Sequence, residues 1–238
     1  MAAVYDAVAA WYAASVRSGS PVHAVAEPAL RKLCGDVSGL AVCDLACGAG
    51  YAACWLQAAG ATVTGIDLSA PLLEIARAEI GDDSVALVCA DVSNMPTIRS
   101  GTFDGAVCSL ALMDVADLDG CLAETSRVLR PGGWLVFTIT HPCFQCPESR
   151  WTGKRGGVVK REVRGYFREG HWRSDNAAGV RGQVGAYHRT LSAYLNSVIR
   201  MGFAIERILE PQPEDDVAAR VPGYAEVPVV LAVRCAKR

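Results

Sequence analysis

The chain has 238 residues, of which 51% are hydrophobic, and a formal net charge of −2 at pH 7. This length suits one domain with a large core, and the near-zero charge argues against bulk attraction to nucleic acid or to an anionic membrane. No apolar run reaches the roughly 18 residues needed to cross a bilayer, and the N-terminus lacks the regions of a signal peptide. We therefore expect a cytoplasmic protein whose ten cysteines are reduced.

Helical patterns dominate the first 35 residues. Apolar residues at helical spacing predict an amphipathic helix over residues 1–16, which either packs on a core or covers an aromatic ligand through Tyr5 and Tyr12. Pro28 suits the first turn of a second helix. His23, which lies between the two predicted helices, is expected to be solvated.

A glycine turn follows in the stretch Val42–Gly50, V-C-D-L-A-C-G-A-G. It joins a buried strand to a helix predicted over residues 49–59, and such a turn presents free backbone N–H groups at a helix N-terminus. Gly48-x-Gly50 fits a dinucleotide site, whose pyrophosphate Asp44 would repel. A cationic cofactor such as S-adenosylmethionine would instead suit Asp44, and a tight turn without any ligand is the third possibility.

Carboxylates also lie where the next two strands end. Residues 62–67 predict a β-branched strand ending in Asp67, a position from which a carboxylate binds the hydroxyls of a ribose. Ser69 then caps a helix. Residues 85–89 predict a third strand, and Asp91 just beyond it can accept a hydrogen bond from an adenine amino group.

The later strands complete a sheet. Residues 103–110 and 134–140 predict strands on either side of a helix over residues 117–130. Strands that alternate with helices predict a doubly wound parallel sheet, which binds its ligands at the carboxyl ends of the strands. Five polar residues fall at those ends: Asp44, Asp67, Asp91, Ser109 and His141.

Residues 143–187 interrupt this alternation with a segment rich in glycine and arginine. Loops of this length are usually lids or binding elements, so we expect this one to cover an acceptor pocket together with the first helix. The expected pocket residues are Tyr5, Tyr12, Met113, Phe144, Tyr166 and Trp172. A helix over residues 191–201 follows, and then two strands, 204–209 and 227–235, which should pair antiparallel because no helix separates them.

Taken in order, these motifs resemble those of class I S-adenosylmethionine-dependent methyltransferases of the bacterial small-molecule type, from Leu40 to the C-terminus. The matching stretches are Asp44–Gly50, Gly65–Ser69, Ala90–Val92, Phe103-Asp104 and Leu129–Trp134. The resemblance implies an α/β fold with a doubly wound, seven-stranded and mostly parallel sheet in the order 3-2-1-4-5-7-6. In one departure, Met113-Asp114 stands where relatives often carry His.

The resemblance also implies the cofactor and the organisation of the chain. S-adenosylmethionine is expected as cofactor and S-adenosylhomocysteine as product, in a single domain made of a cap (1–35), a cofactor-binding core (36–142), a lid (143–187) and a C-terminal part (188–238). The implied cofactor residues are Asp44, Ala46, Gly48, Gly50, Asp67, Leu68, Ala90, Asp91, Val92 and Ser109.

The expected reaction moves a methyl group to an O, N or C nucleophile of a small molecule, of the secondary-metabolite kind, in a monomer or homodimer that binds neither nucleic acid nor membrane. His141 is the predicted base and His188 the second candidate. The basic stretch 148–173 leaves an RNA or protein methyltransferase as an alternative, and a non-catalytic cofactor-binding subunit is another. His141, Cys143 and Cys146 resemble half a zinc site, but without a second ligand pair we expect no metal.

Overall fold

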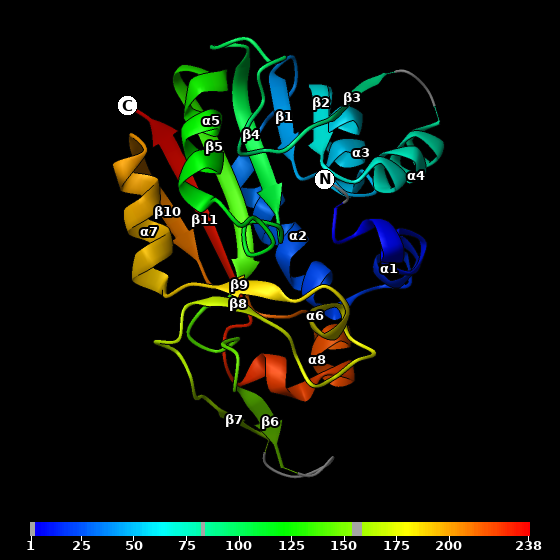
Figure 1. The fold of residues 1–238 in the computed structure, drawn as a ribbon, viewed down its shortest axis with the longest axis vertical. Coiled ribbons are helices and arrows are strands. Elements are labelled where there is room, and N and C mark those ends of the chain that lie inside the picture. The colour runs from blue at the N-terminus through cyan, green and yellow to red at the C-terminus, as the bar shows by residue number, and fades with distance from the viewer. Residues whose placement is uncertain (1–2, 82–83, 154–158) are drawn as a thin grey trace.

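A seven-stranded sheet forms the centre of the computed structural model, which describes residues 3–81, 84–153 and 159–238 (Figure 1). Its strands are β1 (Ala41–Leu45), β2 (Thr62–Asp67), β3 (Val85–Cys89), β4 (Phe103–Ser109), β5 (Leu129–Thr140), β10 (Phe203–Leu209) and β11 (Val230–Lys237). They lie in the order β10-β11-β5-β4-β1-β2-β3, and β11 runs antiparallel to both of its neighbours. The predicted order 3-2-1-4-5-7-6 is confirmed, since β10 and β11 are the sixth and seventh strands of this sheet along the chain.

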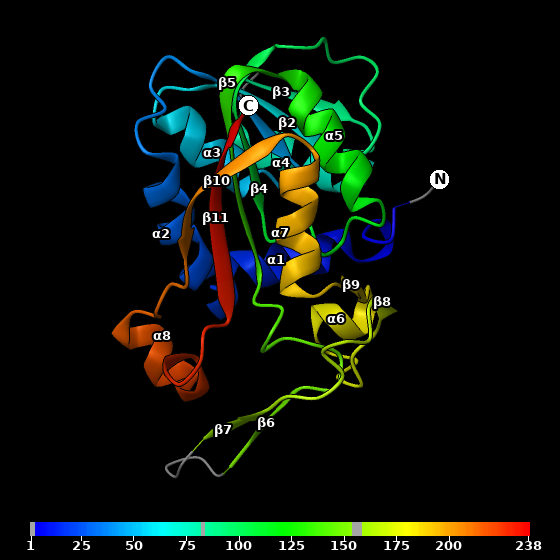
Figure 2. The ribbon, with the colours of Figure 1, turned by 90° about the vertical axis from the view of Figure 1, so that its left-hand side faces the viewer.

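Helices cover both faces of the sheet, which explains why its central strands are almost continuously apolar. Figure 2 shows α2 (Pro21–Cys34) and α3 (Tyr51–Ala58) on one face and α5 (Leu118–Val128) and α7 (Leu191–Arg200) on the other. The core therefore has two parts, one on each side of the sheet. A third apolar cluster joins α1 (Ala9–Arg17) to α4 (Ala70–Ile80) and to the turn that precedes α3.

The N-terminal cap differs from the prediction at both helices. The first helix begins at Ala9, after a 3-10 turn over Asp6–Val8, and residues 1–2 of the predicted helix lie outside the described residues. The second begins at Pro21, which leaves Pro28 inside α2. Pro21 occupies the first helical position, where the missing N–H would have no partner within the helix, so it is the better starting residue.

Two strand boundaries also shift. The strand predicted over residues 134–140 begins at Leu129, directly after α5 ends at Val128, and therefore includes Pro131, Gly132 and Gly133. β11 begins at Val230 because its register follows β5, where Val230 pairs with Thr140. Neither shift changes which residues reach the carboxyl ends of the strands.

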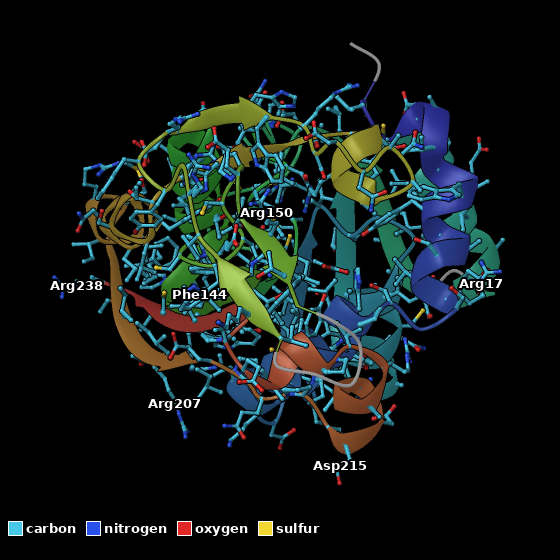
Figure 3. All side chains as sticks on the ribbon, turned by 90° about the horizontal axis from the view of Figure 1, so that it is seen from below. Arg17, Phe144, Arg150, Arg207, Asp215 and Arg238 are labelled. Atoms are coloured by element: carbon cyan, nitrogen blue, oxygen red, sulfur yellow. The ribbon has the colours of Figure 1, made fainter. Side chains whose placement is uncertain are left out.

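The lid contains short pairs of strands. β6 (Arg150–Thr152) pairs with β7 (Lys160–Glu162), and β8 (Gly170–Trp172) pairs with β9 (Ala186–His188) around α6 (Val180–Gln183). Residues 154–158 of the predicted lid lie outside the described residues. These pairs extend beyond the carboxyl ends of the central strands (Figure 1) and cross the end of the molecule seen in Figure 3.

The connection between β10 and β11 folds back toward the lid. It contains α8 (Asp215–Arg220) and a 3-10 turn, η2 (Pro222–Ala225). Tyr224 of this turn lies beside Trp151 of β6, with 6.4 Å between the ring centres. No helix among the described residues is long and apolar enough to cross a membrane. All ten cysteines are free.

Candidate active site

A cavity of about 460 Å³ lies at the carboxyl ends of β1, β2 and β4, and we call it the acidic cavity. Eight of the ten predicted cofactor residues line it: Asp44, Ala46, Gly48, Asp67, Leu68, Asp91, Val92 and Ser109. Gly50 and Ala90 are not among its lining residues. Gly50 instead faces α4, where an added Cβ would lie 3.1 Å from Cβ of Ala76, so this glycine allows α3 and α4 to pack closely.

The turn between β1 and α3 adopts backbone conformations that side chains disfavour. Gly48 has φ 55°, and Ala46 has φ 52° despite its Cβ. Among the described non-glycine residues only Ala46 and Leu110 have positive φ, and both line the acidic cavity. Such local strain is typical of ligand sites, where the surrounding structure holds it in place.

Asp44 ends β1 as a buried carboxyl group with 1% exposure. Its Oδ2 has no hydrogen-bond partner among the described residues. Burial is the main cause that raises the pKa of Asp44 to about 8, and the nearby charge of Asp67 raises it further, against a backbone hydrogen bond from Ala53. An unpaired buried acceptor of this kind is stabilised by a cation in the cavity.

Asp67 ends β2, where both of its carboxylate oxygens accept backbone hydrogen bonds. The N–H of Gly48 donates to Oδ2 and the N–H of Ser69 donates to Oδ1, each over 2.8 Å. Burial raises the pKa of Asp67, although these bonds lower it. The two bonds fix the carboxylate beside the glycine turn, and each oxygen retains a second lone pair for a ligand.

The acidic cavity has one sign of charge. Its described lining contains five aspartates, at positions 44, 67, 91, 114 and 117, and neither lysine nor arginine. A pyrophosphate would meet only repulsion from these groups, whereas a ligand that carries an ammonium and a sulfonium would be attracted. This charge distribution argues against the dinucleotide alternative.

A second cavity, of about 440 Å³, lies under the lid, and we call it the aromatic cavity. Tyr5, Tyr12, Met113 and Trp172 line it, as the sequence predicts. Phe144 and Tyr166 are not among its lining residues, in contrast to the prediction. The ring of Phe144 packs against His141 and that of Tyr166 against His188, so both support the lid from outside the cavity.

The two cavities meet. Six described residues line both of them: Tyr5, Tyr12, His23, Leu110, Ala186 and Tyr187. The two cavities are therefore adjacent, which is the arrangement that a transfer between two bound molecules requires.

A chain of polar contacts closes one side of the junction. The hydroxyl of Tyr5 donates to Oδ2 of Asp114 over 3.2 Å, and Arg181 of α6 forms an ion pair with Oδ1 of Asp114. Burial raises the pKa of Asp114, and Arg181 and Tyr5 partly offset this. The pKa of Tyr5 and of Tyr12 are also raised, chiefly by burial, which keeps both phenols neutral.

His23 is half-buried at the junction, and the prediction that it is solvated is wrong. Helix α2 begins earlier than predicted and carries the ring against Tyr12, with 6.5 Å between ring centres. Its Nδ1 lies 3.0 Å from Oγ of Ser20, while Nε2 has no hydrogen-bond partner within the described ranges. Burial lowers the pKa of His23 to about 4, so the ring is neutral at neutral pH.

The two predicted catalytic histidines differ in position. His141 is 2% exposed and does not line either cavity; its Nε2 lies 2.9 Å from Oε1 of Glu210, and its Nδ1 accepts from the N–H of Cys143 over 3.2 Å. Burial lowers the pKa of His141, and Glu210 partly offsets this by raising it. His188 does line the aromatic cavity, where its Nε2 donates to the carbonyl of Tyr166 over 2.7 Å.

Several lining residues have no signal in the sequence pattern. Trp151, Tyr187 and Tyr224 line the aromatic cavity from segments without hydrophobic periodicity. Arg161 lies within the basic stretch, which did indicate a binding element but not which of its arginines faces inward. Among the described residues no group of three or more His, Cys, Asp or Glu has the arrangement of a metal site.

Comparisons with known proteins agree with this geometry. A family model described as a methyltransferase domain matches residues 43–137. The crystal structure of an S-adenosylmethionine-dependent methyltransferase from Mesorhizobium loti is 33% identical, covers 92% of this chain and 99% of its own, and superposes with a TM-score of 0.79. The chain therefore belongs to the S-adenosylmethionine-dependent methyltransferases.

Two curated relatives match a shorter region. A ubiquinone biosynthesis O-methyltransferase from Bordetella avium is 32% identical over 123 residues, which is 50% of this chain and 51% of the relative. A demethylmenaquinone methyltransferase from Clavibacter sepedonicus is 39% identical over 101 residues, 42% of this chain and 41% of the relative. The chain thus spans about half the length of these relatives or less.

The protein is an enzyme of this family, and its cofactor is S-adenosylmethionine. The acidic cavity fits that cofactor on the observations above: its described lining contains five aspartates and neither lysine nor arginine, and the orphaned Oδ2 of Asp44 provides an acceptor for a cationic group.

Proposed function

We propose that the enzyme transfers the methyl group to an O, N or C nucleophile of a small molecule, of the secondary-metabolite kind, held in the aromatic cavity. The observation that carries the proposal is the junction, where six residues line both cavities. A volume of about 440 Å³ suits a small ligand, and its aromatic lining suits a ring. Relatives named for ubiquinone biosynthesis and for demethylmenaquinone support an acceptor with a ring.

The proposed cofactor site follows the lining of the acidic cavity. Asp44 and the backbone of Gly48 and Ala49 hold the methionine end, Asp67 binds the ribose hydroxyls, and Asp91 accepts from the adenine amino group. When bound, S-adenosylmethionine supplies a methyl group already activated by its sulfonium. The chain's own residues then have two tasks, which are to align the acceptor and to remove its proton.

We propose His23 as the group that accepts this proton. It lies at the junction, its ring is neutral, and its Nε2 has no partner in the described part of the chain. His141 fits a positioning role, because both ring nitrogens are engaged and it holds Glu210 against the start of the lid. His188 stays the second candidate for the base, since it lines the same cavity.

The direct test uses S-adenosylmethionine with a deuterated methyl group. The enzyme is incubated with a metabolite extract, with RNA and with protein, and the label is followed by mass spectrometry. We expect label in small molecules. Label confined to RNA or protein would support the alternative acceptors, and no label in any of them, with cofactor binding intact, would favour a non-catalytic subunit.

The cofactor site is tested by Asp67→Ala. We expect the affinity for S-adenosylmethionine to fall by about 1.5–3 kcal/mol, the scale of losing hydrogen bonds to a charged group. Isothermal titration calorimetry measures this, with Asp36→Ala as a control because Asp36 is exposed and does not line the acidic cavity. Equal affinities of the two variants would remove the ribose role, and binding of NADH in place of S-adenosylmethionine would contradict the site as a whole.

The base is tested by His23→Ala with an acceptor found as above. We expect kcat to fall by about 10-fold or more, with little change in cofactor affinity; this is less than a base with a pKa near the working pH contributes, because the lowered pKa of His23 makes its ring a weak base. Since the pKa of His23 is lowered to about 4, the wild-type kcat, measured with saturating S-adenosylmethionine, should stay level from pH 8 down to pH 6. It should decline only at lower pH, where the ring becomes protonated. An unchanged kcat in His23→Ala, together with a loss of kcat in His188→Ala, would assign the role to His188.

A further inference from the structure

The charge of the aromatic cavity is opposite to that of the acidic cavity. Its described lining contains three arginines, Arg161, Arg181 and Arg189, and no aspartate or glutamate. Binding cavities and their ligands generally carry complementary charges, so a concentration of positive charge in this cavity indicates a negatively charged acceptor. The contacts of each arginine decide which of them is available.

Two of the three are committed to the protein. Arg181 forms an ion pair with Asp114, which neutralises it, and it also donates to the carbonyl of Gly185 over 2.9 Å. Arg189 donates from Nη2 to the carbonyls of Val115 and Ala116 over 2.7 and 2.8 Å. These contacts fix the loop after β4 to the end of the lid, so both arginines have structural partners.

Arg161 of β7 has only neutral partners. Its Nε donates to the carbonyl of Phe144 over 2.7 Å, and its Nη2 donates to Oε1 of Gln145 and Oγ of Ser149 over 2.8 and 2.7 Å. Among the described residues no carboxylate lies within ion-pair distance of it, and its Nη1 has no hydrogen-bond partner. The guanidinium is thus held in one orientation with one amino group unused.

The surroundings of Arg161 are apolar and aromatic. Its Cζ lies 4.8 Å from the centre of the Trp151 ring, and the Trp151 ring lies 6.4 Å from that of Tyr224. The side chain is half-buried, and burial lowers its pKa. A buried charge without a counter-charge costs free energy, which an anion bound beside it would recover.

We infer that Arg161 binds an anionic oxygen group, a carboxylate or a phosphate, on the methyl acceptor, whose ring lies among the aromatic side chains beside it. The inference rests on the proposed function and names the chemistry of its substrate. The two N–H bonds of Nη1, which have no partner among the described residues, can donate charge-assisted hydrogen bonds to such a group. The opposite charges of the two cavities would also direct the cationic cofactor and the anionic acceptor each to its own cavity.

The test separates a metabolite extract by anion exchange into an anionic and a non-anionic pool. Each pool is incubated with deuterium-labelled S-adenosylmethionine and with wild type, Arg161→Gln, Arg161→Lys or Arg150→Gln. Arg150 is the matched control, because it lies on the same hairpin (Figure 3) but is exposed and does not line the cavity. Calorimetry with S-adenosylhomocysteine checks that every variant still binds the product in the acidic cavity.

We expect the wild type to label compounds of the anionic pool. Arg161→Gln should lower that labelling at least 10-fold through a higher KM. Arg161→Lys should keep part of the labelling, and Arg150→Gln should label as the wild type does. Elution of the labelled compounds before and after treatment with a phosphatase distinguishes phosphate from carboxylate. Label in the non-anionic pool alone, or equal labelling by wild type and Arg161→Gln, overturns the inference but leaves the proposed function intact. No label from either pool contradicts the proposed function itself.

Discussion

At the scale of single residues, Asp44 has a conflict between burial and charge that a cationic ligand would resolve. Its carboxyl group is 1% exposed, and burial raises its pKa to about 8, so in the free enzyme it is mostly protonated at pH 7. A positive charge nearby favours the carboxylate and lowers this pKa. Binding of the cofactor must then release the proton.

We therefore predict that S-adenosylmethionine binding at pH 7 releases up to about one proton per site from Asp44. The affinity should rise between pH 6 and pH 8, because the free group must lose its proton below its pKa of about 8 but not above it. Calorimetry in buffers of different ionisation enthalpy measures the release, which Asp44→Asn should abolish. An affinity that increases as the pH falls would show that Asp44 is not the group responding to the cofactor.

Single site residues can be predicted from the sequence where the same residue type recurs at the end of each strand. Asp44, Asp67 and Asp91 lie at or just after the ends of three successive strands. They can be identified from the sequence because a parallel sheet brings the carboxyl ends of its strands to one edge. His23 could not be identified in this way. Its burial depends on the start of α2 at Pro21. The sequence alone does not fix this start, because both Pro21 and Pro28 suit the first turn of a helix.

At the scale of elements, the lid is built from pairs of strands too short to be predicted. β6, β7, β8 and β9 have three residues each, and three residues cannot display an alternating pattern. The long central strands and helices could be predicted because both faces of the sheet are covered and the helices have one apolar face. The break in the alternation at residues 143–187 is visible in the sequence, but the strand pairs within that segment are not.

The β6–β7 hairpin lines the aromatic cavity through Trp151 and Arg161 and contributes nothing to the described lining of the acidic cavity. Replacing residues 151–161 by a short Gly-Asn turn, which the pairing of Arg150 with Glu162 allows, should abolish methyl transfer and leave S-adenosylmethionine affinity within about twofold. Transfer of a radiolabelled methyl group measures the activity, and calorimetry measures the S-adenosylmethionine affinity. Parallel loss of both would assign the hairpin a role in folding.

At the scale of the whole molecule, the site is assembled from segments that are distant in the sequence. Tyr5 of the cap, Asp114 after β4 and Arg181 of the lid form one chain of contacts across the junction. The side chains of Arg181 and Asp114 are 22% and 19% exposed, so their ion pair is largely removed from water. The cap and the lid are thereby fixed to the core at the junction of the two cavities.

Removal of either partner should leave the other charge partly buried without compensation. We predict that Arg181→Gln and Asp114→Asn each lower the free energy of unfolding by about 2–3 kcal/mol, and that the double variant loses at least about 1 kcal/mol less than the sum of the two. Urea denaturation of the four proteins measures this coupling. The exposed pair Arg200–Asp119, with side chains 54% and 48% exposed, is the control, and its coupling should stay below about 1 kcal/mol. If the Arg181 and Asp114 effects simply add, the pair does not join the lid to the core, and the closure of the junction must come from the packing of Tyr5 and Tyr12 alone.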